Sequence, residues 1–516
     1  STHTLLLVRN GQSTRAHNST EVSYTNTVYA GGDFVGYRWD GDAGTFKIYK
    51  NNSQVAEYNN FTLTGPFYFA LDRHSGSNTS ETHRINFGQD STFSNQETAT
   101  NNADSNGVGK FHYAVPSGHL ALCTKNLSDS LPVSQDIRPE DFFAAHLHTG
   151  TSATQSITGL GFQPDLVWIK ARNQTSSHGL FDSVRGVGRR LYSNHNYDEA
   201  VEDGVTSFGA DGFGLGGASG TNSLNHKFVS WNWKAGGAPT ATNVAAAGAV
   251  PTSGSVMING VASSSALAGG NPAKKISANT KSGFSIVQYM GTGNGVQTIA
   301  HGLSKAPEML LVKNMDDDEN WAMYHHAAGN SNVNSAANVI SFRMNTDNIA
   351  SATTNGRWGD ATPTNTVFSI GDTTTDNEVG SSGDNYIAYC WHGVEGYSSF
   401  GFFEGTNSAN GAYVITGFKP AFVMVKAING ASGSSFDYVV WDNKRNGSSQ
   451  STIDVGRNPI NGGLLWNENG AEITTHSINF LSNGFKCSSS SAGSNSAYDY
   501  IYMAFAEQPQ KYSRGR

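Results

Sequence analysis

The stretch PEMLLVK, from Pro307 to Lys313, decides the fold because the chain contains the same arrangement three times. The other two copies read PDLVWIK, from Pro164 to Lys170, and PAFVMVK, from Pro420 to Lys426. In each copy the lysine lies six positions after the proline, and the four residues before the lysine are apolar. Because these apolar residues do not alternate with polar ones, each copy predicts a strand that is central in its sheet and buried on both faces. The proline suits the first residue of such a strand, where its missing N–H removes no ladder bond.

Two further blocks accompany every copy. A glycine-bearing turn precedes it, and a strand-like block closes the unit: FVSWNW at 228–233, YIAYCW at 386–391 and YIYMAF at 500–505. Turn residues recur throughout, and no stretch carries a helical stripe, which is typical of β-sandwiches. We therefore predict an all-β, multidomain fold with three related β-sandwich repeats.

Composition separates these repeats from the rest of the chain. Residues 238–278 shift to Ala, Gly, Ser and Thr, which is linker composition, either flexible or draped over a neighbour. Such a linker would let repeats 1 and 2 be offset from each other, whereas the short join between repeats 2 and 3 predicts rigid end-to-end packing. The predicted division is an N-terminal β-sandwich at 1–135, repeat 1 at 136–237, the linker at 238–278, repeat 2 at 279–395, repeat 3 at 396–510 and a C-terminal tail at 511–516.

The charge balance excludes some classes of partner. The 516 residues carry a formal net charge of −8, from 33 Lys and Arg against 41 Asp and Glu. This acidic balance offers no field for phosphate backbones, so we do not expect nucleic acid as a partner. No apolar run approaches the roughly 18 residues that span a membrane, so we expect no membrane insertion. Charged residues make up only 14% of the chain, so Asn, Ser, Thr and Gly must cover much of the surface.

The cysteines and the start of the chain are less informative. Cys123, Cys390 and Cys487 lie in different predicted domains without CxxC spacing, which favours small buried side chains over a disulfide or a zinc site. The opening STHTLLLVRN reads as a short alternating strand without the regions of a signal peptide. It lacks an initiator methionine, which leaves a processed chain and a fragment of a longer protein both open.

The N-terminal segment carries a recognisable order of motifs. A hairpin from Tyr37, WDGDAGTFKIYKN, is followed by FYFAL and NFGQ, within strands expected at 67–72 and 84–90, and by PSGHLALCTKNL. This order resembles a SPRY domain, a concanavalin-like β-sandwich found in many binding proteins. The resemblance implies such a sandwich for residues 1–135, with short opening strands.

A second resemblance covers nearly the whole chain. Its most specific pieces are ISANTKSGFSIVQYMGTG at 276–293, WHGVEGYSSFGFFEG at 391–405 and YIYMAFAEQP at 500–509. A SPRY-like segment followed by such units resembles tail fibre and related appendage proteins of bacteriophages. The resemblance implies a structural protein of the virion surface that attaches to the host, contacts other virion tail proteins and recognises a host-surface glycan or protein.

Oligomerisation is part of this expectation. The resemblance implies a homo-oligomer, expected as a trimer, whose strands at the three-fold axis would bury apolar area that no single repeat can cover. A trimer would also multiply weak binding sites through effective concentration. A glycan depolymerase tailspike and a capsid-borne decoration fibre stay open as alternatives.

The candidate catalytic groups are few. Asp182 and Asp442 occupy equivalent positions, but repeat 2 has His325 there, and no second acid recurs as a glycosidase requires. We therefore predict no catalytic residue. We also predict no metal site and no cofactor for the other polar groups, which are the DGDAG turn at 40–44, the acidic run 316–319 and the adjacent His325 and His326.

For glycan binding the sequence offers two aromatic residues in polar loops, Trp358 in NGRWGD and Tyr197 in SNHNYDE. An exposed ring amid amides and hydroxyls can stack on the C–H face of a sugar, although either ring could equally fold inward. Tyr324, by contrast, is matched by Phe181 and Trp441 in the other repeats, which indicates a core aromatic.

The lysines that end the repeated strands have two interpretations. We predict that the stems of Lys170, Lys313 and Lys426 cover apolar surface while their ammonium heads reach water. The alternative is that they anchor a partner or ligand. Under the first interpretation the repeats define the architecture, and function is expected in the loops that differ between copies.

Overall fold

The computed structural model divides the chain into two compact units, residues 1–128 and 129–516. The structure describes residues 4–6, 15–18, 20–21, 32–40, 43–58, 84, 86–88, 90–93, 96–121, 138–293, 295–330, 340–349, 351–352, 356–371, 377–430, 436–445 and 460–506.

The described part of the first unit contains two three-stranded antiparallel sheets, β1-β2-β3 and β4-β5-β6. The predicted hairpin from Tyr37 is confirmed as β4 and β5. The strand predicted at 84–90 is wrong for its described residues, because the Asn86 side chain accepts bonds from the N–H groups of Gly88 and Asp90 and forms a turn. The strand predicted at 67–72 lies outside the described residues. The strands are β1 Thr4–Leu6, β2 Arg15–Asn18, β3 Thr20–Glu21, β4 Val35–Asp40, β5 Thr45–Lys50 and β6 Ser53–Tyr58.

The second unit is almost entirely β-structure, which confirms the all-β prediction. Its described helical elements are short: η2 Pro139–Asp141, α1 Ser219–Asn222 and η3 His326–Asn330. Repeat 1 contains β7 Phe143–Thr149, β8 Gln155–Thr158, β9 Leu166–Ala171, β10 Gly179–Asp182, β11 Arg189–Arg190, β12 Ala200–Val201, β13 Val205–Gly209, β14 Gly212–Leu215 and β15 Lys227–Trp233.

The other two repeats follow the same order. Repeat 2 contains β19 Phe284–Met290, β20 Gln297–Ala300, β21 Met309–Asn314, β22 Ala322–His325, β23 Ile340–Arg343, β24 Ser351–Ala352, β25 Val367–Ile370 and β26 Asn385–Trp391. Repeat 3 contains β27 Ser398–Glu404, β28 Tyr413–Ile415, β29 Phe422–Ala427, β30 Val439–Asp442, β31 Leu464–Leu465, β32 Ile478–Leu481, β33 Gly484–Cys487 and β34 Asp499–Phe505.

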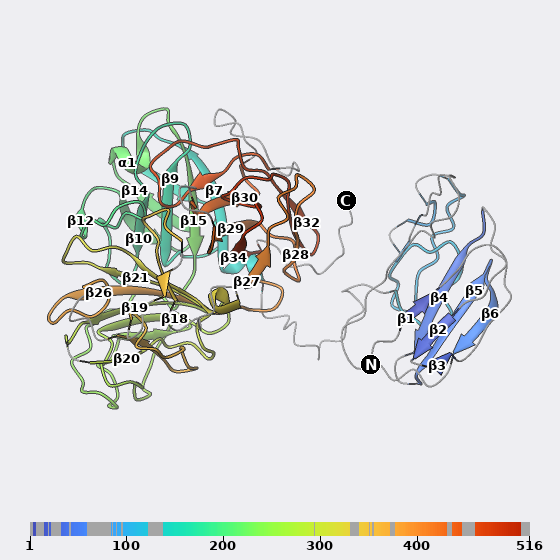
Figure 1. The fold of residues 1–516 in the computed structure, drawn as a ribbon, viewed down its shortest axis with the longest axis horizontal. Coiled ribbons are helices and arrows are strands. Elements are labelled where there is room, and N and C mark those ends of the chain that lie inside the picture. Colours follow the sequence, from blue (N-terminus) through green and yellow to red (C-terminus); the bar gives the residue numbers. More distant parts are fainter. Residues whose placement is uncertain are drawn as a thin grey trace. The chain divides into compact units, whose positions relative to one another are not determined.

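All three repeats share one topology (Figure 1). In the main sheet the closing strand pairs with both the opening strand and the repeated apolar strand, in the orders β7-β15-β9-β10, β19-β26-β21-β22 and β27-β34-β29-β30. A smaller sheet forms the second layer of each sandwich, from β8-β14-β13, β20-β25 and β28-β33-β32. The repeated apolar strands β9, β21 and β29 are therefore central, as predicted, and every residue in them is buried.

The prolines lie two residues before these strands and not at their first residue. The residue after each proline already donates its N–H to the end of the closing strand: Asp165 to Trp233, Glu308 to Trp391 and Ala421 to Phe505, at 2.7–2.8 Å. The proline thus precedes the first hydrogen bond of the strand, where its missing N–H is not needed.

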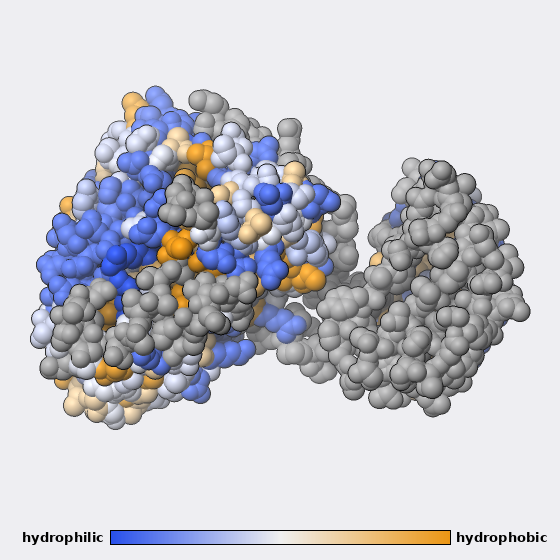
Figure 2. All heavy atoms as spheres, viewed as in Figure 1, coloured by the Kyte–Doolittle hydropathy of each residue, from blue (hydrophilic) through white to orange (hydrophobic). Residues whose placement is uncertain are grey.

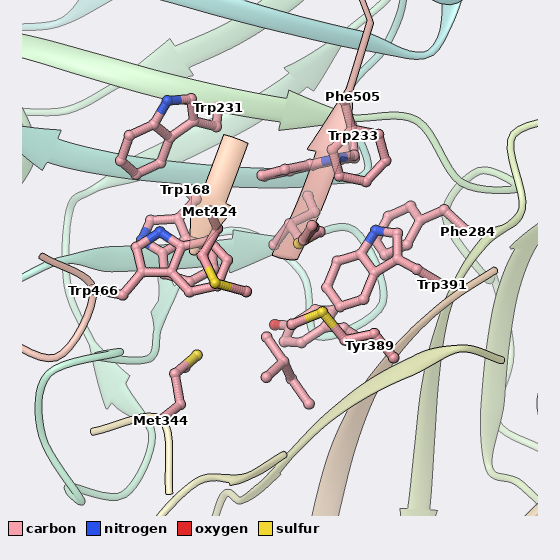
Figure 3. Close-up of a cluster of buried hydrophobic side chains, with 14 of the residues drawn as sticks. Trp168, Trp231, Trp233, Phe284, Met344, Tyr389, Trp391, Met424, Trp466 and Phe505 are labelled. Atoms are coloured by element: carbon pink, nitrogen blue, oxygen red, sulfur yellow. The ribbon is translucent and has the colours of Figure 1, made fainter. Parts of the chain in front are cut away.

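Each central strand has two buried faces with different partners. One face packs into the core of its own sandwich. In repeat 2 this face carries Leu310 and Val312. The other face, with Met309 and Leu311, joins a single apolar cluster that contains residues of all three repeats. Figure 3 shows part of this shared core, where Trp168, Trp231, Trp233, Trp391, Met424, Trp466 and Phe505 come together from the three repeats.

The shared core changes the predicted arrangement of the repeats. They pack face to face around one centre, so the prediction that repeats 2 and 3 stack end to end is wrong. Ring contacts join all three pairs of repeats: Trp168 with Trp466 at 4.3 Å, Trp233 with Trp391 at 6.4 Å and His325 with Phe400 at 6.4 Å between ring centroids.

The segment 238–278 is built into this unit. It contains β16 Val256–Ile258, β17 Val261–Ala262 and the start of β18 Lys275–Asn279, which extend the main sheet of repeat 2. Gly236, at the end of repeat 1, packs so closely on these strands that a Cβ there would lie 2.4 Å from the carbonyl oxygens of Met257 and Ala278. The segment is thus draped over repeat 2, as one of the two predicted alternatives had it.

Candidate functional site

Three equivalent asparagines hold the loops at the interfaces between repeats. The Oδ1 atoms of Asn194, Asn345 and Asn467 accept bonds of 3.0 Å from the N–H groups of His178, Trp321 and Tyr438, the residues just before β10, β22 and β30. Because this contact recurs in every repeat, it aligns the three loops residue by residue.

The side chains of those donor residues then reach the next repeat and form a closed ring of contacts. The His178 Nε2 bonds to the Leu465 carbonyl at 2.9 Å, the Trp321 Nε1 to the Tyr192 carbonyl at 2.8 Å, and the Tyr438 hydroxyl to the Arg343 carbonyl at 3.3 Å. The three acceptors are themselves equivalent positions, two residues before the aligned asparagines. Repeat 1 therefore binds repeat 3, repeat 3 binds repeat 2 and repeat 2 binds repeat 1, which is a pseudo-three-fold arrangement within one chain.

The two equivalent aspartates are part of this framework. Asp182 and Asp442 are fully buried, and each accepts a bond of 2.6 Å from the Nε of an arginine three residues later, Arg185 or Arg445. Each carboxylate also accepts a bond from another repeat: Asp182 from the Tyr389 hydroxyl at 2.7 Å, and Asp442 from the Trp231 indole N–H at 2.9 Å. In repeat 2, His325 makes the matching contact with the Tyr502 carbonyl of repeat 3. These groups therefore hold the repeats together.

The lysines that end the central strands do not reach water. Lys170, Lys313 and Lys426 are fully buried, which contradicts the predicted exposed ammonium heads. Carbonyl oxygens surround the heads: Lys170 donates to Gly470 at 2.7 Å and Lys426 to Asp347 at 3.4 Å, both in another repeat. Burial lowers the pKa of Lys170 and Lys426 to about 7 and that of Lys313 to about 8. Loops of neighbouring repeats supply the Gly470 and Asp347 carbonyls, whereas the Asn314 and Asp317 carbonyls that bind Lys313 belong to repeat 2 itself.

Of the two predicted glycan contacts, Trp358 is a core residue. It is 1% exposed, its Nε1 donates to the Ile340 carbonyl at 3.2 Å, and its ring meets Tyr324 edge to face. The ring is therefore part of the apolar core of repeat 2. The predicted core aromatics Phe181, Tyr324 and Trp441 are all buried, as expected.

Tyr197 lies at the surface, with 47% of its area exposed. Its ring stacks on the ring of His195, with centroids 4.4 Å apart and planes 11° apart, and Tyr192 meets it edge to face. The Ser177 hydroxyl lies 2.9 Å from the His195 Nε2, and the Arg190 guanidinium lies over the Tyr192 ring. We call Tyr192, His195 and Tyr197 the aromatic platform. Burial, with the nearby charge of Arg190, lowers the pKa of His195 and so favours its neutral ring.

The platform lies at the interface of repeats 1 and 2. The Tyr192 carbonyl accepts the hydrogen bond from Trp321 that links repeats 2 and 1. Asp318 of repeat 2 binds the residues on both sides of Tyr197. Its carbonyl accepts a bond of 2.9 Å from the Asn196 side chain, and its Oδ1 accepts one of 3.0 Å from the Asp198 N–H. The predicted solvated turn at 316–319 is confirmed, since Asp316, Asp317 and Asp318 are exposed between β21 and β22. The turn at 316–319 also supports the Tyr197 loop through Asp318, and this contact was not predicted.

The aligned loops show that the platform belongs to repeat 1 alone. The positions of Tyr192, His195 and Tyr197 correspond to Arg343, Thr346 and Asn348 in repeat 2 and to Leu465, Glu468 and Gly470 in repeat 3. His195 was missed by the sequence analysis. The available signal was the spacing of His195 and Tyr197, because alternate residues of an extended segment point the same way.

The family comparison covers the second unit. The family described as "Domain of unknown function (DUF7483)" matches residues 138–260 and 258–509. The chain belongs to the DUF7483 family. The DUF7483 match includes all three repeats and the segment between repeats 1 and 2, so it coincides with the unit that the shared core defines. No curated protein and no solved structure matches the chain.

The described part of the chain contains no group of three or more His, Cys, Asp or Glu side chains arranged to hold a metal ion. His325 and His326 bond instead to the carbonyls of Tyr502 and Phe400 in repeat 3. Cys390 and Cys487 are buried free thiols, as predicted, while Cys123 lies outside the described residues. Among the described helices, none has the length and apolar character of a membrane span.

Proposed function

We propose that the chain is a structural, receptor-binding protein of a phage virion appendage, and that the DUF7483 unit binds a molecule on the host surface. The observation that carries the proposal is the exposed, supported ring of Tyr197 in a loop that differs between otherwise matching repeats. Binding residues typically lie on loops that a rigid scaffold positions, and the ring of inter-repeat contacts provides such a scaffold.

The remaining surface suits adhesion by many weak contacts. Figure 2 shows a mainly hydrophilic face of the DUF7483 unit, with hydrophobic residues in scattered groups. Charged residues make up only 14% of the chain, so amide and hydroxyl groups supply most of its hydrogen-bonding capacity. Several copies on one particle would turn weak individual sites into firm attachment through effective concentration.

Binding is favoured over glycan cleavage because the best acidic candidates are committed elsewhere. Asp182 and Asp442 are fully buried and paired with arginines, so neither reaches a glycosidic bond in this conformation. A glycosidase needs two accessible carboxyl groups about 5–10 Å apart across that bond.

The homotrimer is not required by this proposal. The apolar sheet faces that a trimer was expected to bury already meet within one chain, in the shared core of the three repeats. Contacts between copies, if the particle uses them, would then involve other surfaces.

Two experiments test the proposed function. Antibodies against the purified chain should label an appendage of the particle in electron micrographs. The purified chain should also compete with whole particles for adsorption to host cells, in proportion to its concentration. Absence of the chain from the particle surface, or adsorption that excess chain leaves unchanged, would contradict the proposal.

A further inference from the structure

The aromatic platform is prepared for a flat ligand. The stacking of Tyr197 on His195, the hydrogen bond of His195 to Ser177 and the edge contact of Tyr192 restrain the ring before any ligand arrives. An exposed ring held in this way loses little conformational entropy on binding. Aromatic side chains of this kind have an apolar face and a polar tip, which suits a ligand with both characters.

Exposed carboxylates lie beside the platform. Asp198 follows Tyr197 directly, Asp318 bonds to the Asp198 N–H, and Asp316 and Asp317 continue the same exposed loop.

The cations of this region are paired with carboxylates or buried. Arg185 bonds to Asp182 and Glu199, Arg189 to Glu199, and Arg190 to Glu202. Lys313 is fully buried and donates to the Asn314 and Asp317 carbonyls. Asp198 and Asp318 also interact with the buried Lys313 ammonium, but both are exposed at the surface beside Tyr197, where carboxylates attract cations and repel anions.

We propose that this site binds a sugar ring that carries a positively charged amine. The C–H face of the pyranose stacks on Tyr197, and the ammonium group lies toward Asp198 and Asp318. Both features favour the same ligand, because a cation is attracted to the face of an aromatic ring as well as to carboxylates. The inference rests on the proposed function and names the chemistry of the host molecule.

A basic protein surface is the less favoured partner. A specific protein interface buries about 800 Å² on each side and has several aromatic or aliphatic anchors near its centre. The platform offers one strongly exposed ring with carboxylates beside it. That combination matches a single sugar unit better than a protein patch.

The test is a calorimetric titration of the chain with short oligosaccharides at low salt and pH 6, where the amines of glucosamine oligomers are largely protonated. Oligomers of glucosamine with free amines should bind, whereas fully N-acetylated oligomers and glucose oligomers should bind at least tenfold more weakly. Affinity should fall when salt is raised from 0.02 to 0.5 M, because exposed charges are screened. Equal affinity for the acetylated oligomers would overturn the proposal, as would tighter binding of oligolysine than of the glucosamine oligomers.

Variants locate the site. Tyr197→Ala should weaken binding of the glucosamine oligomers at least tenfold, while Tyr413→Ala, which removes an equally exposed tyrosine in repeat 3, should leave it unchanged. Asp318→Asn should weaken binding several-fold, although its amide oxygen can still accept the Asp198 N–H. Binding that survives Tyr197→Ala would overturn the assignment.

The site and the proposed function fail separately. If the chain blocks adsorption of particles but Tyr197→Ala blocks it equally well, the site is wrong and the attachment function stands. If glucosamine oligomers bind at Tyr197 but the chain is absent from the particle, the site stands and the attachment function is wrong.

Discussion

The indole N–H of Trp231 in repeat 1 donates a hydrogen bond of 2.9 Å to the buried Asp442 carboxylate of repeat 3, across 211 residues of sequence. The same carboxylate accepts a bond of 2.6 Å from the Nε of Arg445. In repeat 1, Asp182 receives the Tyr389 hydroxyl of repeat 2 in the equivalent way. The repeats are thus joined through groups that also hold each loop in place, so local and inter-repeat stability are coupled.

Asp442→Ala should destabilise the whole second unit by roughly 3–5 kcal/mol, because it leaves the Arg445 guanidinium buried without its main counterion. The free energy of unfolding, followed by tryptophan fluorescence in urea, checks this. Asp317→Ala is the control, since that carboxylate is exposed and its loss should change stability by less than about 0.5 kcal/mol. Similar effects from the two changes would show that Asp442 does not hold the interface.

Trp358→Ala should lower the stability of the protein much more than Tyr197→Ala, because Trp358 is a core residue and Tyr197 a surface residue. Removing the fully buried Trp358 ring leaves a cavity and should cost roughly 3–5 kcal/mol of stability. Removing the exposed Tyr197 ring should cost less than about 1 kcal/mol, since it loses little more than the stacking on His195. Urea midpoints of both variants provide the comparison. A stable Trp358→Ala protein would mean that this ring does not fill the core of repeat 2.

The sequence predicted the elements better than their assembly. The unbroken apolar run at 309–312 was enough to place a central strand, because only burial on both faces allows such a run. The outcome for Lys313 was not predictable in this way, since the carbonyls around it come from its own following loop. Lys170 and Lys426 donate hydrogen bonds to loops of other repeats, and Trp358 donates one to the Ile340 carbonyl. No local sequence pattern identifies these acceptors. Sequence periodicity reports which face is buried, but not what covers it.

The buried lysines predict a rise of stability with pH. Lys170, Lys313 and Lys426 have pKa values of about 7 to 8 in the folded state, below the ordinary value of 10.5. Between these values the unfolded chain binds more protons than the folded chain, so stability increases as pH rises from 7 to 10. Buried thiols and tyrosines oppose the trend toward high pH, because burial raises the pKa of Cys390, Cys487, Tyr324 and Tyr386 to about 12.

Lys170→Met tests this linkage, because methionine fills a similar volume without a charge. The wild type should gain more stability than the variant between pH 7 and pH 10, as measured by urea midpoints at both values. Parallel pH profiles for the two proteins would indicate that Lys170 keeps its ordinary pKa.

The structure also predicts how many copies of the chain associate in solution. A homotrimer was expected from the resemblance to phage appendage proteins and would have buried apolar sheet faces of the repeats. The shared core already covers Met309, Phe422 and Trp168 with residues of the other repeats. The ring of contacts closes after three repeats and leaves no fourth partner to bind. We therefore expect the purified chain to be a monomer of 54.9 kDa in light scattering at micromolar concentration.

Deleting one repeat should convert the monomer into an associating or aggregating chain. A chain that ends at residue 395 lacks repeat 3 and exposes the faces that Trp466 and Phe505 covered, so it should aggregate or associate. The full chain should unfold its second unit in a single transition, because each repeat completes the core of the other two. A stable, monomeric two-repeat chain would show that the repeats fold independently. A full chain with three times the mass would show that surfaces outside the shared core bring copies together.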